Sequence, residues 1–357
     1  MTKKEVGKSI LFVVGFLLLL QTVTYMIRTN GAVKDRFMGF YAEKNNTLDA
    51  VILGSSPVPS CYATPLLWGE YGIKVYPMSS NLQRPKAIWH LIEEVRKTQS
   101  PSLYIIELRQ FTAPDDSMTE NMAYTRGVTD NMKYSVNRIK TIRDLVEEPE
   151  ERYHYYFDIF KYHSNWKTIV LPEQIASFRY ERLHPLKGYE SYDKVGPSEI
   201  ADCSATEGTL AIPTEQEAVL AELLQNCKKE NLDVLFVVSP YTMTEEKQKM
   251  YNYMEKIIRQ YDYNMLNLND FYQETQIDFL TDFYDYGGHT NALGAYKITR
   301  FLGEYLSEEY EIKTNNGTDT NSTWNEAYQT WKKEYERAAD TIRVRVNQKE
   351  YTVMEDE

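Results

Sequence analysis

Residues 51–60 read VILGSSPVPS, an apolar run that stops at Gly54, continues into two serines and is then interrupted by two prolines. A short run rich in β-branched residues and bounded by glycine and proline is typical of a buried β-strand. In an open parallel sheet, ligands bind at the carboxyl ends of the strands. The stretch therefore predicts a strand whose end carries either a tight turn or a serine that does chemistry. Whether the serine does chemistry depends on whether other parts of the chain supply it with catalytic partners.

Similar short apolar runs alternate with longer segments of helical periodicity along residues 48–312. This alternation is typical of a mostly parallel sheet with helices on both faces. The sequence therefore predicts an α/β fold with three layers around a parallel sheet of about five strands. We expect strands at residues 48–54, 73–79, 102–108, 232–238 and 263–269. We expect helices between and after them at residues 85–97, 214–229, 243–260 and 291–309.

The composition is that of a globular chain with an acidic balance. Of the 357 residues, 42% are hydrophobic, and 40 basic residues stand against 52 acidic ones, which gives a net charge of −12. An excess of negative charge attracts phosphate backbones weakly, so nucleic acid is not an expected partner. The three cysteines include no C-x-x-C pair, which disfavours a zinc site, while a disulfide between Cys203 and Cys227 stays open.

Residues 9–27, SILFVVGFLLLLQTVTYMI, form an uncharged apolar run of the length that a membrane-spanning helix requires. Three lysines within residues 1–8 make that segment a cytoplasmic tail by the positive-inside tendency. We therefore expect a single-pass anchor in the cell membrane, a short polar linker over residues 28–47, and an extracytoplasmic domain. A cleavable signal peptide is the alternative, but the run is long for one and no clear small-x-small site follows it.

An insertion at residues 112–213 separates the third and fourth expected strands and includes the aromatic stretch YHYYFDIFKYHSNW (153–166). Tyrosine and tryptophan offer apolar faces with a polar rim, which suit sugar rings and polymer chains. Insertions of this kind often shape the cleft of an open sheet. We expect a lid or substrate platform with Tyr155 and Trp166; a structural cap on the sheet is the alternative. Residues 313–357 are expected to form a polar linker and a C-terminal helix.

A nucleophilic serine needs a base and an orienting carboxylate, and the stretch TDFYDYGGHTN (281–291), just before the last expected helix, contains both. A serine hydroxyl is a poor nucleophile until a histidine removes its proton, and the imidazole works best when a carboxylate sets its tautomer. The sheet edge and the glycine-rich loop together make this constellation available. The candidates are Ser55 or Ser56 as nucleophile, His289 as base, and Asp285 or Asp282 as acid.

These residues carry a resemblance to the SGNH, or GDSL, hydrolase superfamily, over roughly residues 47–309. In that family the nucleophilic serine ends the first strand of a flavodoxin-like sheet, and an Asp-x-x-His motif precedes the last helix. The chain is most similar to the membrane-anchored Gram-positive branch, which includes the lipoteichoic-acid D-alanylation esterase, and more distantly to alginate-type O-acetyltransferases. The resemblance implies that Ser56 is the nucleophile, because Gly54-Ser55-Ser56 stands at the Gly-Asp-Ser position, and that His289 is the base.

The chain departs from the family pattern in the spacing of the acid, in the two segments that build the oxyanion hole, and in the residue after the serine. Asp285 lies four residues before His289 rather than three, so it is our first choice for the acid and Asp282 our second. At the end of the third strand, where the family has an asparagine of the oxyanion hole, Glu107-Leu108-Arg109 has none. A carboxylate there would repel an oxyanion. Pro57 follows the serine where many relatives have histidine. Where the family has a glycine of the oxyanion hole, after the second strand, this chain reads SSNLQRP (79–85). This stretch supplies three oxyanion-hole candidates: the backbone N–H near Ser80 and the amides of Asn81 and Gln83.

The resemblance implies an extracytoplasmic serine esterase or O-acyltransferase that works through an acyl-Ser56 intermediate. Its expected partners are the membrane and an acylated cell-envelope glycan or teichoic-acid-like polymer, and no metal or organic cofactor is implied. The alternative is a catalytically inactive envelope protein that binds polysaccharide or a membrane-bound acyltransferase. The missing asparagine and the shifted aspartate favour this alternative, whereas the presence of Ser56, Asp285 and His289 together favours the enzyme.

Overall fold

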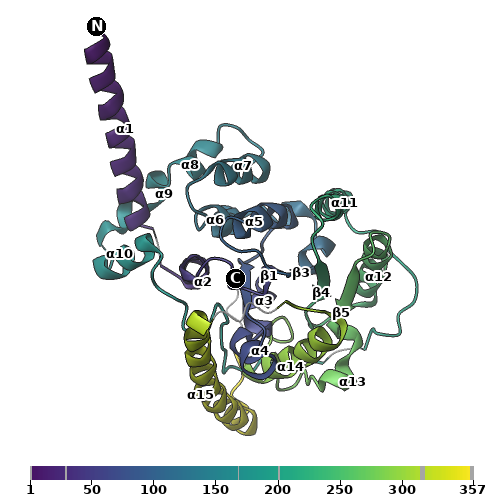
Figure 1. The fold of residues 1–357 in the computed structure, drawn as a ribbon. Coiled ribbons are helices and arrows are strands. Elements are labelled where there is room, and N and C mark those ends of the chain that lie inside the picture. Colours follow the sequence, from purple (N-terminus) through teal and green to yellow (C-terminus); the bar gives the residue numbers. More distant parts are fainter. Residues whose placement is uncertain (1, 29, 168, 200–201, 314–317, 354–357) are drawn as a thin grey trace.

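The computed structural model describes residues 2–28, 30–167, 169–199, 202–313 and 318–353. At its centre lies a five-stranded sheet in the order β2-β1-β3-β4-β5, with every pair of neighbours parallel (Figure 1). The expected α/β fold with a parallel sheet is therefore confirmed, and each strand lies within its expected range. The strands are β1 (Ala50–Gly54), β2 (Val75–Ser79), β3 (Leu103–Glu107), β4 (Val234–Val238) and β5 (Asn264–Asn267).

Alternate residues of the buried strands enter two separate cores, because successive side chains of a strand point to opposite faces. Val51 and Leu53 pack into one core together with residues of α2, α5, α11 and α12. Ala50 and Ile52 pack into the other core with residues of α3, α4 and α14. The helices on the first face are α2 (Ala32–Ala42), α5 (Ile88–Val95), α11 (Thr214–Lys229) and α12 (Glu245–Arg259); those on the second are α3 (Pro57–Cys61), α4 (Thr64–Tyr71) and α14 (Ala292–Glu309).

The N-terminal helix α1 (Lys3–Met26) projects away from the body of the protein (Figure 1). It is long and apolar enough to cross a membrane, and none of its apolar stretch is buried. This agrees with the expected anchor at residues 9–27.

The expected polar linker over residues 28–47 is wrong. This stretch contains α2, and Phe37 and Phe40 are fully buried against the sheet. The apolar residues Val33, Phe37, Phe40 and Tyr41 have helical spacing, which identifies one face of an amphipathic helix. The domain therefore begins almost at the base of α1 rather than after a flexible connection.

The insertion is helical and lies on the same side of the molecule as α1 (Figure 1). Its α-helices are α6 (Met122–Thr129), α7 (Val136–Leu145), α8 (Arg152–Tyr156), α9 (Ile159–Tyr162) and α10 (Leu171–Arg179). The C-terminal helix α15 (Thr318–Gln348) packs against α4 and α14. Shorter elements are η1 (Pro85–Ala87), η2 (Arg109–Thr112), η3 (Asp115–Met118), η4 (His163–Lys167), η5 (Leu268–Asp270) and α13 (Tyr272–Thr275).

Candidate active site

Three of the expected site residues form one hydrogen-bonded chain at the carboxyl edge of the sheet. Ser56 Oγ lies 2.8 Å from Nε2 of His289, and Nδ1 of the same ring lies 2.5 Å from Oδ2 of Asp285. A carboxylate at Nδ1 favours the tautomer with its proton on that nitrogen, which leaves Nε2 free to accept the serine proton. The serine and the histidine are 233 residues apart in the sequence, so the fold brings them together.

Ser56 is placed by the turn from β1 into α3. It is the N-cap residue of α3 and stands two positions after Gly54, the last residue of a strand whose residues are all buried. A Cβ at Gly54 would stand 2.6 Å from the Cβ of Glu107 and 2.8 Å from a methyl group of Val58, so only glycine fits where the strand meets its neighbour. The neighbouring Ser55 is buried and accepts a hydrogen bond from Gln110 at 3.2 Å, away from the histidine.

The loop that carries His289 bends sharply after Asp285. Tyr286 and Gly287 both have positive φ, at 62° and 90°, a backbone conformation that glycine adopts readily and tyrosine rarely. Two backbone hydrogen bonds hold this bend, from Tyr286 N–H to the carbonyl of Gly196 at 2.9 Å and from Thr242 N–H to that of Gly287 at 2.8 Å. Asn291 then caps α14, as its position in the sequence suggested.

Asp282, the second choice for the acid, does not contact His289. Its Oδ2 accepts from Lys297 Nζ at 2.6 Å and from the backbone N–H of Asp278 at 2.8 Å, while its Oδ1 accepts from Thr281. Burial raises the pKa of this carboxyl, and the ion pair with Lys297 opposes the rise. Asp282 therefore fastens the loop to α14, and Asp285 is the carboxylate at the histidine.

Of the three oxyanion-hole candidates, only Asn81 lines the cavity that contains Ser56. Its side chain is exposed. Ser80 and Gln83 are buried, and the Ser80 hydroxyl contacts the amide oxygen of Gln83 at 3.4 Å. Gln83, the other side-chain candidate, therefore does not line the cavity.

Glu107, which would repel an oxyanion, does not line the cavity that contains Ser56. Its side chain is buried, and Oε1 lies 3.4 Å from the backbone N–H of Ser239 at the end of β4. Burial raises the pKa of this carboxyl, although the neighbouring Arg109 opposes the rise. Arg109 itself donates to the carbonyl of Gly288 at 2.7 Å and so stabilises the loop that carries His289.

Ser56 and His289 open into a cavity of about 560 Å³ that extends to the base of α1. Beside the histidine, Tyr284 stacks on the imidazole with 5.7 Å between ring centroids, and Tyr192 stacks on Tyr284 at 4.2 Å. The lining is mixed in charge. It includes Arg28, Lys34, Arg126, Lys161, Asp130 and Glu190.

The two expected platform residues do not line this cavity. Tyr155 is buried inside the insertion, where it packs against Ile142 and Val146. Trp166 is 63% exposed and lies outside the cavity lining. The aromatic wall is built from Tyr124, Tyr162, Tyr192 and Tyr284. Tyr162 belongs to the aromatic stretch 153–166 and Tyr284 to the stretch that carries His289, whereas no local motif marks Tyr124 or Tyr192.

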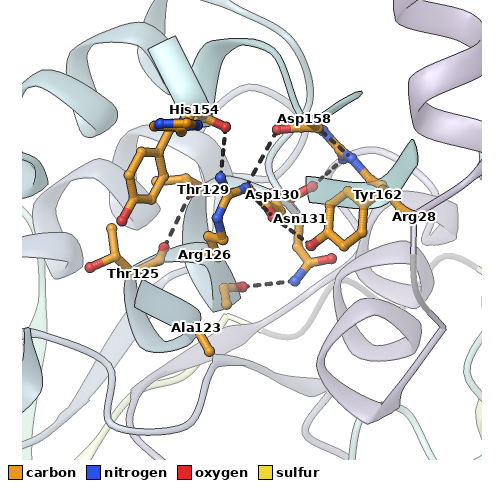
Figure 2. A network of polar contacts seen from close by, with 12 residues as sticks. Arg28, Ala123, Thr125, Arg126, Thr129, Asp130, Asn131, His154, Asp158 and Tyr162 are labelled. Carbon is orange, nitrogen blue, oxygen red and sulfur yellow. Dashed lines mark hydrogen bonds and ion pairs between the residues drawn. The ribbon is translucent and has the colours of Figure 1, made fainter. Parts of the chain in front are cut away.

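A buried network of charges forms the far wall of the cavity and joins the end of α1 to the insertion (Figure 2). Arg28 pairs with Asp158, and its Nη1 also donates to the backbone carbonyl of Asp130. The Asp130 carboxylate accepts from Arg126 at 3.1 Å and from the Tyr162 hydroxyl at 2.6 Å. Burial alone would raise the pKa of Asp130, but three guanidinium groups, with Arg126 the strongest, hold it below its ordinary value.

A second cation of this wall is Lys34 on α2. It donates to Asn30 at 3.0 Å and to Gln174 at 2.7 Å. Burial lowers the pKa of Lys34 to about 8, and the nearby charge of Arg28 adds to the shift. Sequence reasoning missed both Arg28 and Lys34 because it assigned their segment to a linker.

All three cysteines are free and buried, so the structure contains no bridge between Cys203 and Cys227. Within the described ranges, no group of three or more His, Cys, Asp or Glu side chains is placed to hold a metal ion.

The fold and the site thus define an α/β protein in which a serine, a histidine and an aspartate are linked in series by hydrogen bonds at the carboxyl edge of the sheet. Searches against protein-family models, curated proteins and solved structures found no match for the chain.

Proposed function

We propose that this chain is a membrane-anchored serine esterase or O-acyltransferase of SGNH type, with its domain outside the cytoplasm. The observation that carries the proposal is the hydrogen-bonded sequence Ser56–His289–Asp285, with 2.8 Å and 2.5 Å between the contacting atoms. Its position at the end of β1 and before α14 agrees with the SGNH pattern. The substrates are acyl groups on cell-envelope glycans or teichoic-acid-like polymers.

The reaction begins when Ser56 Oγ attacks the acyl carbon and its proton passes to Nε2 of His289. Asp285 holds the imidazole and stabilises the imidazolium that forms. The tetrahedral intermediate then collapses, the polymer hydroxyl leaves with the proton from His289, and the acyl group remains on Ser56. Water or a sugar hydroxyl attacks this ester, again with His289 as the base, and releases free acid or a new ester.

The developing oxyanion needs donors on the side of Ser56 that faces the cavity. Asn81 is the candidate that lines this side, and the SGNH pattern adds the backbone N–H of the nucleophile. The stacked Tyr192 and Tyr284 offer an apolar face beside the reacting groups, which suits a sugar ring next to the scissile ester.

The second candidate is a non-catalytic envelope protein that binds polysaccharide or a membrane acyltransferase. One observation favours it: of the two side-chain amides expected to donate to the oxyanion, that of Gln83 belongs to a buried residue that does not line the cavity. The short contact between Ser56 and His289 speaks against it, because a binding protein has no need of a serine poised on an imidazole.

Active-site labelling separates the two candidates. A fluorophosphonate should label the purified full chain at Ser56, and Ser56→Ala should abolish the labelling while the neighbouring Ser55→Ala retains it. A parent chain that takes no label, or labelling that survives Ser56→Ala, would rule out the esterase and transferase alike. Incubation with an acylated donor and a defined acceptor glycan then distinguishes hydrolysis from transfer, because free acid and acylated glycan are separate products.

A further inference from the structure

The second half of the insertion exposes a group of large apolar side chains beside the base of α1. Each of them is more than a third exposed, which is unusual for a cluster of residues of this kind on a soluble domain. The lysines Lys161 and Lys167 lie within the same stretch. The exposed apolar residues are Phe157, Phe160, Trp166, Val170, Leu171, Ile175 and Phe178.

Helix α10 has its amphipathic faces reversed. Leu171, Ile175 and Phe178 have the i, i+4, i+7 spacing of an apolar stripe, and all three are exposed. The polar Gln174 points inward and is 1% exposed. In a helix that packs on a soluble core, the apolar stripe faces the protein and polar residues face water. The stripe of α10 therefore faces something other than water or the core of this domain.

Hydrogen bonds fix this orientation of α10. Gln174 Nε2 donates to the carbonyl of Arg28 at 3.1 Å and to the side chain of Asn30 at 3.0 Å, and its Oε1 accepts from Lys34 at 2.7 Å. All three partners belong to the junction between α1 and α2. A rotation that buried the apolar stripe would break this set and leave buried polar groups without partners.

The stripe is continuous with the apolar surface of α1. The ring of Phe178 contacts the ring of Tyr25 near the end of α1, with 5.4 Å between centroids. A hydrocarbon core of about 30 Å takes up about 20 residues of helix at 1.5 Å per residue. Counted from Ser9, where the uncharged run begins, this length reaches the end of α1, which is the level where α10 packs.

We propose that α10 lies in the interface of the lipid bilayer, with Leu171, Ile175 and Phe178 among the acyl chains. The proposal rests on the membrane anchoring that forms part of the proposed function. Interfacial helices bury an apolar face at the boundary of headgroups and acyl chains, and aromatic and basic residues are common at this level. Phospholipid is therefore what covers this apolar stripe.

One consequence is that the cavity opens at the bilayer surface. Its lining includes residues 30–34, at the junction of α1 and α2, and Lys161 of the insertion, as well as Ser56 and His289. A site held in this position selects acyl groups on lipid-anchored polymers near the membrane over acyl groups on distant or soluble polymer.

The depth of α10 can be measured without any turnover. A polarity-sensitive fluorophore is attached at Ile175→Cys in the full chain, reconstituted in phosphatidylcholine–phosphatidylglycerol vesicles. The matched control is Val344→Cys on α15, another exposed apolar position. The parent chain is treated in the same way, to measure any background labelling of its three buried cysteines. Lipids with nitroxides on their acyl chains should quench the label at position 175 about twofold or more, and leave that at position 344 unquenched.

Equal exposure of the two labels to water-soluble quenchers would overturn the proposal. A label at position 175 that is exposed in pure lipid but shielded in native membranes would also overturn it, because a membrane protein rather than lipid would then cover the stripe. The same measurement on Ser56→Ala should give the same depth, so a failure of the proposed chemistry does not affect the result.

A second measurement connects the stripe to substrate choice. The double variant Leu171→Ser with Ile175→Ser alters no residue of the cavity lining. It should hydrolyse a water-soluble short-chain ester at the parent rate, while hydrolysis of an acyl ester on a lipid-anchored glycan in the same vesicles falls about tenfold. The reason is that α1 still anchors the chain but α10 no longer fixes the orientation of the cavity toward the bilayer. Equal rates on the lipid-anchored ester would contradict the inference, and the melting temperature of the variant shows that it folds.

Discussion

Asp285 holds His289 through both of its carboxylate oxygens: Oδ2 lies 2.5 Å from ring Nδ1, and Oδ1 accepts the backbone N–H of the same residue at 2.6 Å. The spacing of four residues leaves room for both contacts because the chain turns back at Tyr286 and Gly287, which have positive φ. The spacing of four residues therefore still brings the carboxylate to the ring nitrogen opposite the one that faces Ser56.

Replacement of this acid should separate catalysis from stability. We expect Asp285→Asn to lower kcat by about 10³- to 10⁴-fold, because the amide no longer favours the productive tautomer of His289. Asp282→Asn should keep most of the activity but lower the free energy of unfolding by about 2 kcal/mol, because the amide cannot accept all three hydrogen bonds that the buried carboxyl accepts. Rates and denaturation curves of both variants test this, and the reverse pattern would make Asp282 the acid.

Removal of the Asn81 amide should weaken transition-state stabilisation. We expect Asn81→Ala to lower kcat by about 10²-fold with little change in KM, as for the loss of one oxyanion donor. Asn131 also lines the cavity, but its amide already donates to the carbonyl of Gly127 at 2.8 Å, so Asn131→Ala is the matched control. A loss of the same size in both variants would show that Asn81 only shapes the cavity.

Tyr155 should matter for stability and not for substrate preference. Tyr155→Ala removes a buried ring from the contact with Ile142 and Val146, and we expect it to cost about 3 kcal/mol of unfolding free energy. Tyr153→Ala nearby removes a ring that is 46% exposed and should cost less than about 1 kcal/mol. Thermal unfolding measures both, and a change in the ratio of rates on long and short acyl esters would restore Tyr155 as a substrate contact.

Neutralising Glu107 should stabilise the fold in a pH-dependent way. Its pKa is raised above the ordinary value of 4.5 by burial, so the folded state favours the protonated carboxyl. The contribution of Glu107 to stability is therefore largest below that value and falls as the pH rises through the raised pKa.

The Glu107→Gln side chain does not ionise, so the variant does not lose stability as the pH rises. Its free energy of unfolding should exceed that of the parent chain by near zero at about pH 4 and by about 1 kcal/mol at pH 8. Chemical denaturation across this range measures the difference, with the exposed Glu120→Gln as the control. An advantage that shrinks as the pH rises would mean that the carboxylate is the favoured form.

The order of strands and helices could be predicted from the sequence because it depends on local patterns. The five apolar runs and the helical periodicity between them lie where β1 to β5, α5, α11, α12 and α14 are found. Ser56 and His289 could be selected as partners because one follows the first strand and the other precedes the last helix. Parallel strands bring their carboxyl ends to one edge of the sheet, so these two positions converge in this type of fold.

Only the tertiary structure decided which side chains face the site and which face away. Asp285 rather than Asp282 meets the histidine because of a bend at Tyr286 and Gly287 that packs on Gly196 and Thr242, residues distant in the sequence. Tyr155 turns into the insertion, and Gln174 turns inward on α10 because its partners lie on the α1–α2 junction. Periodicity records which residues share a face of an element, but the environment of that face depends on contacts between distant parts of the chain.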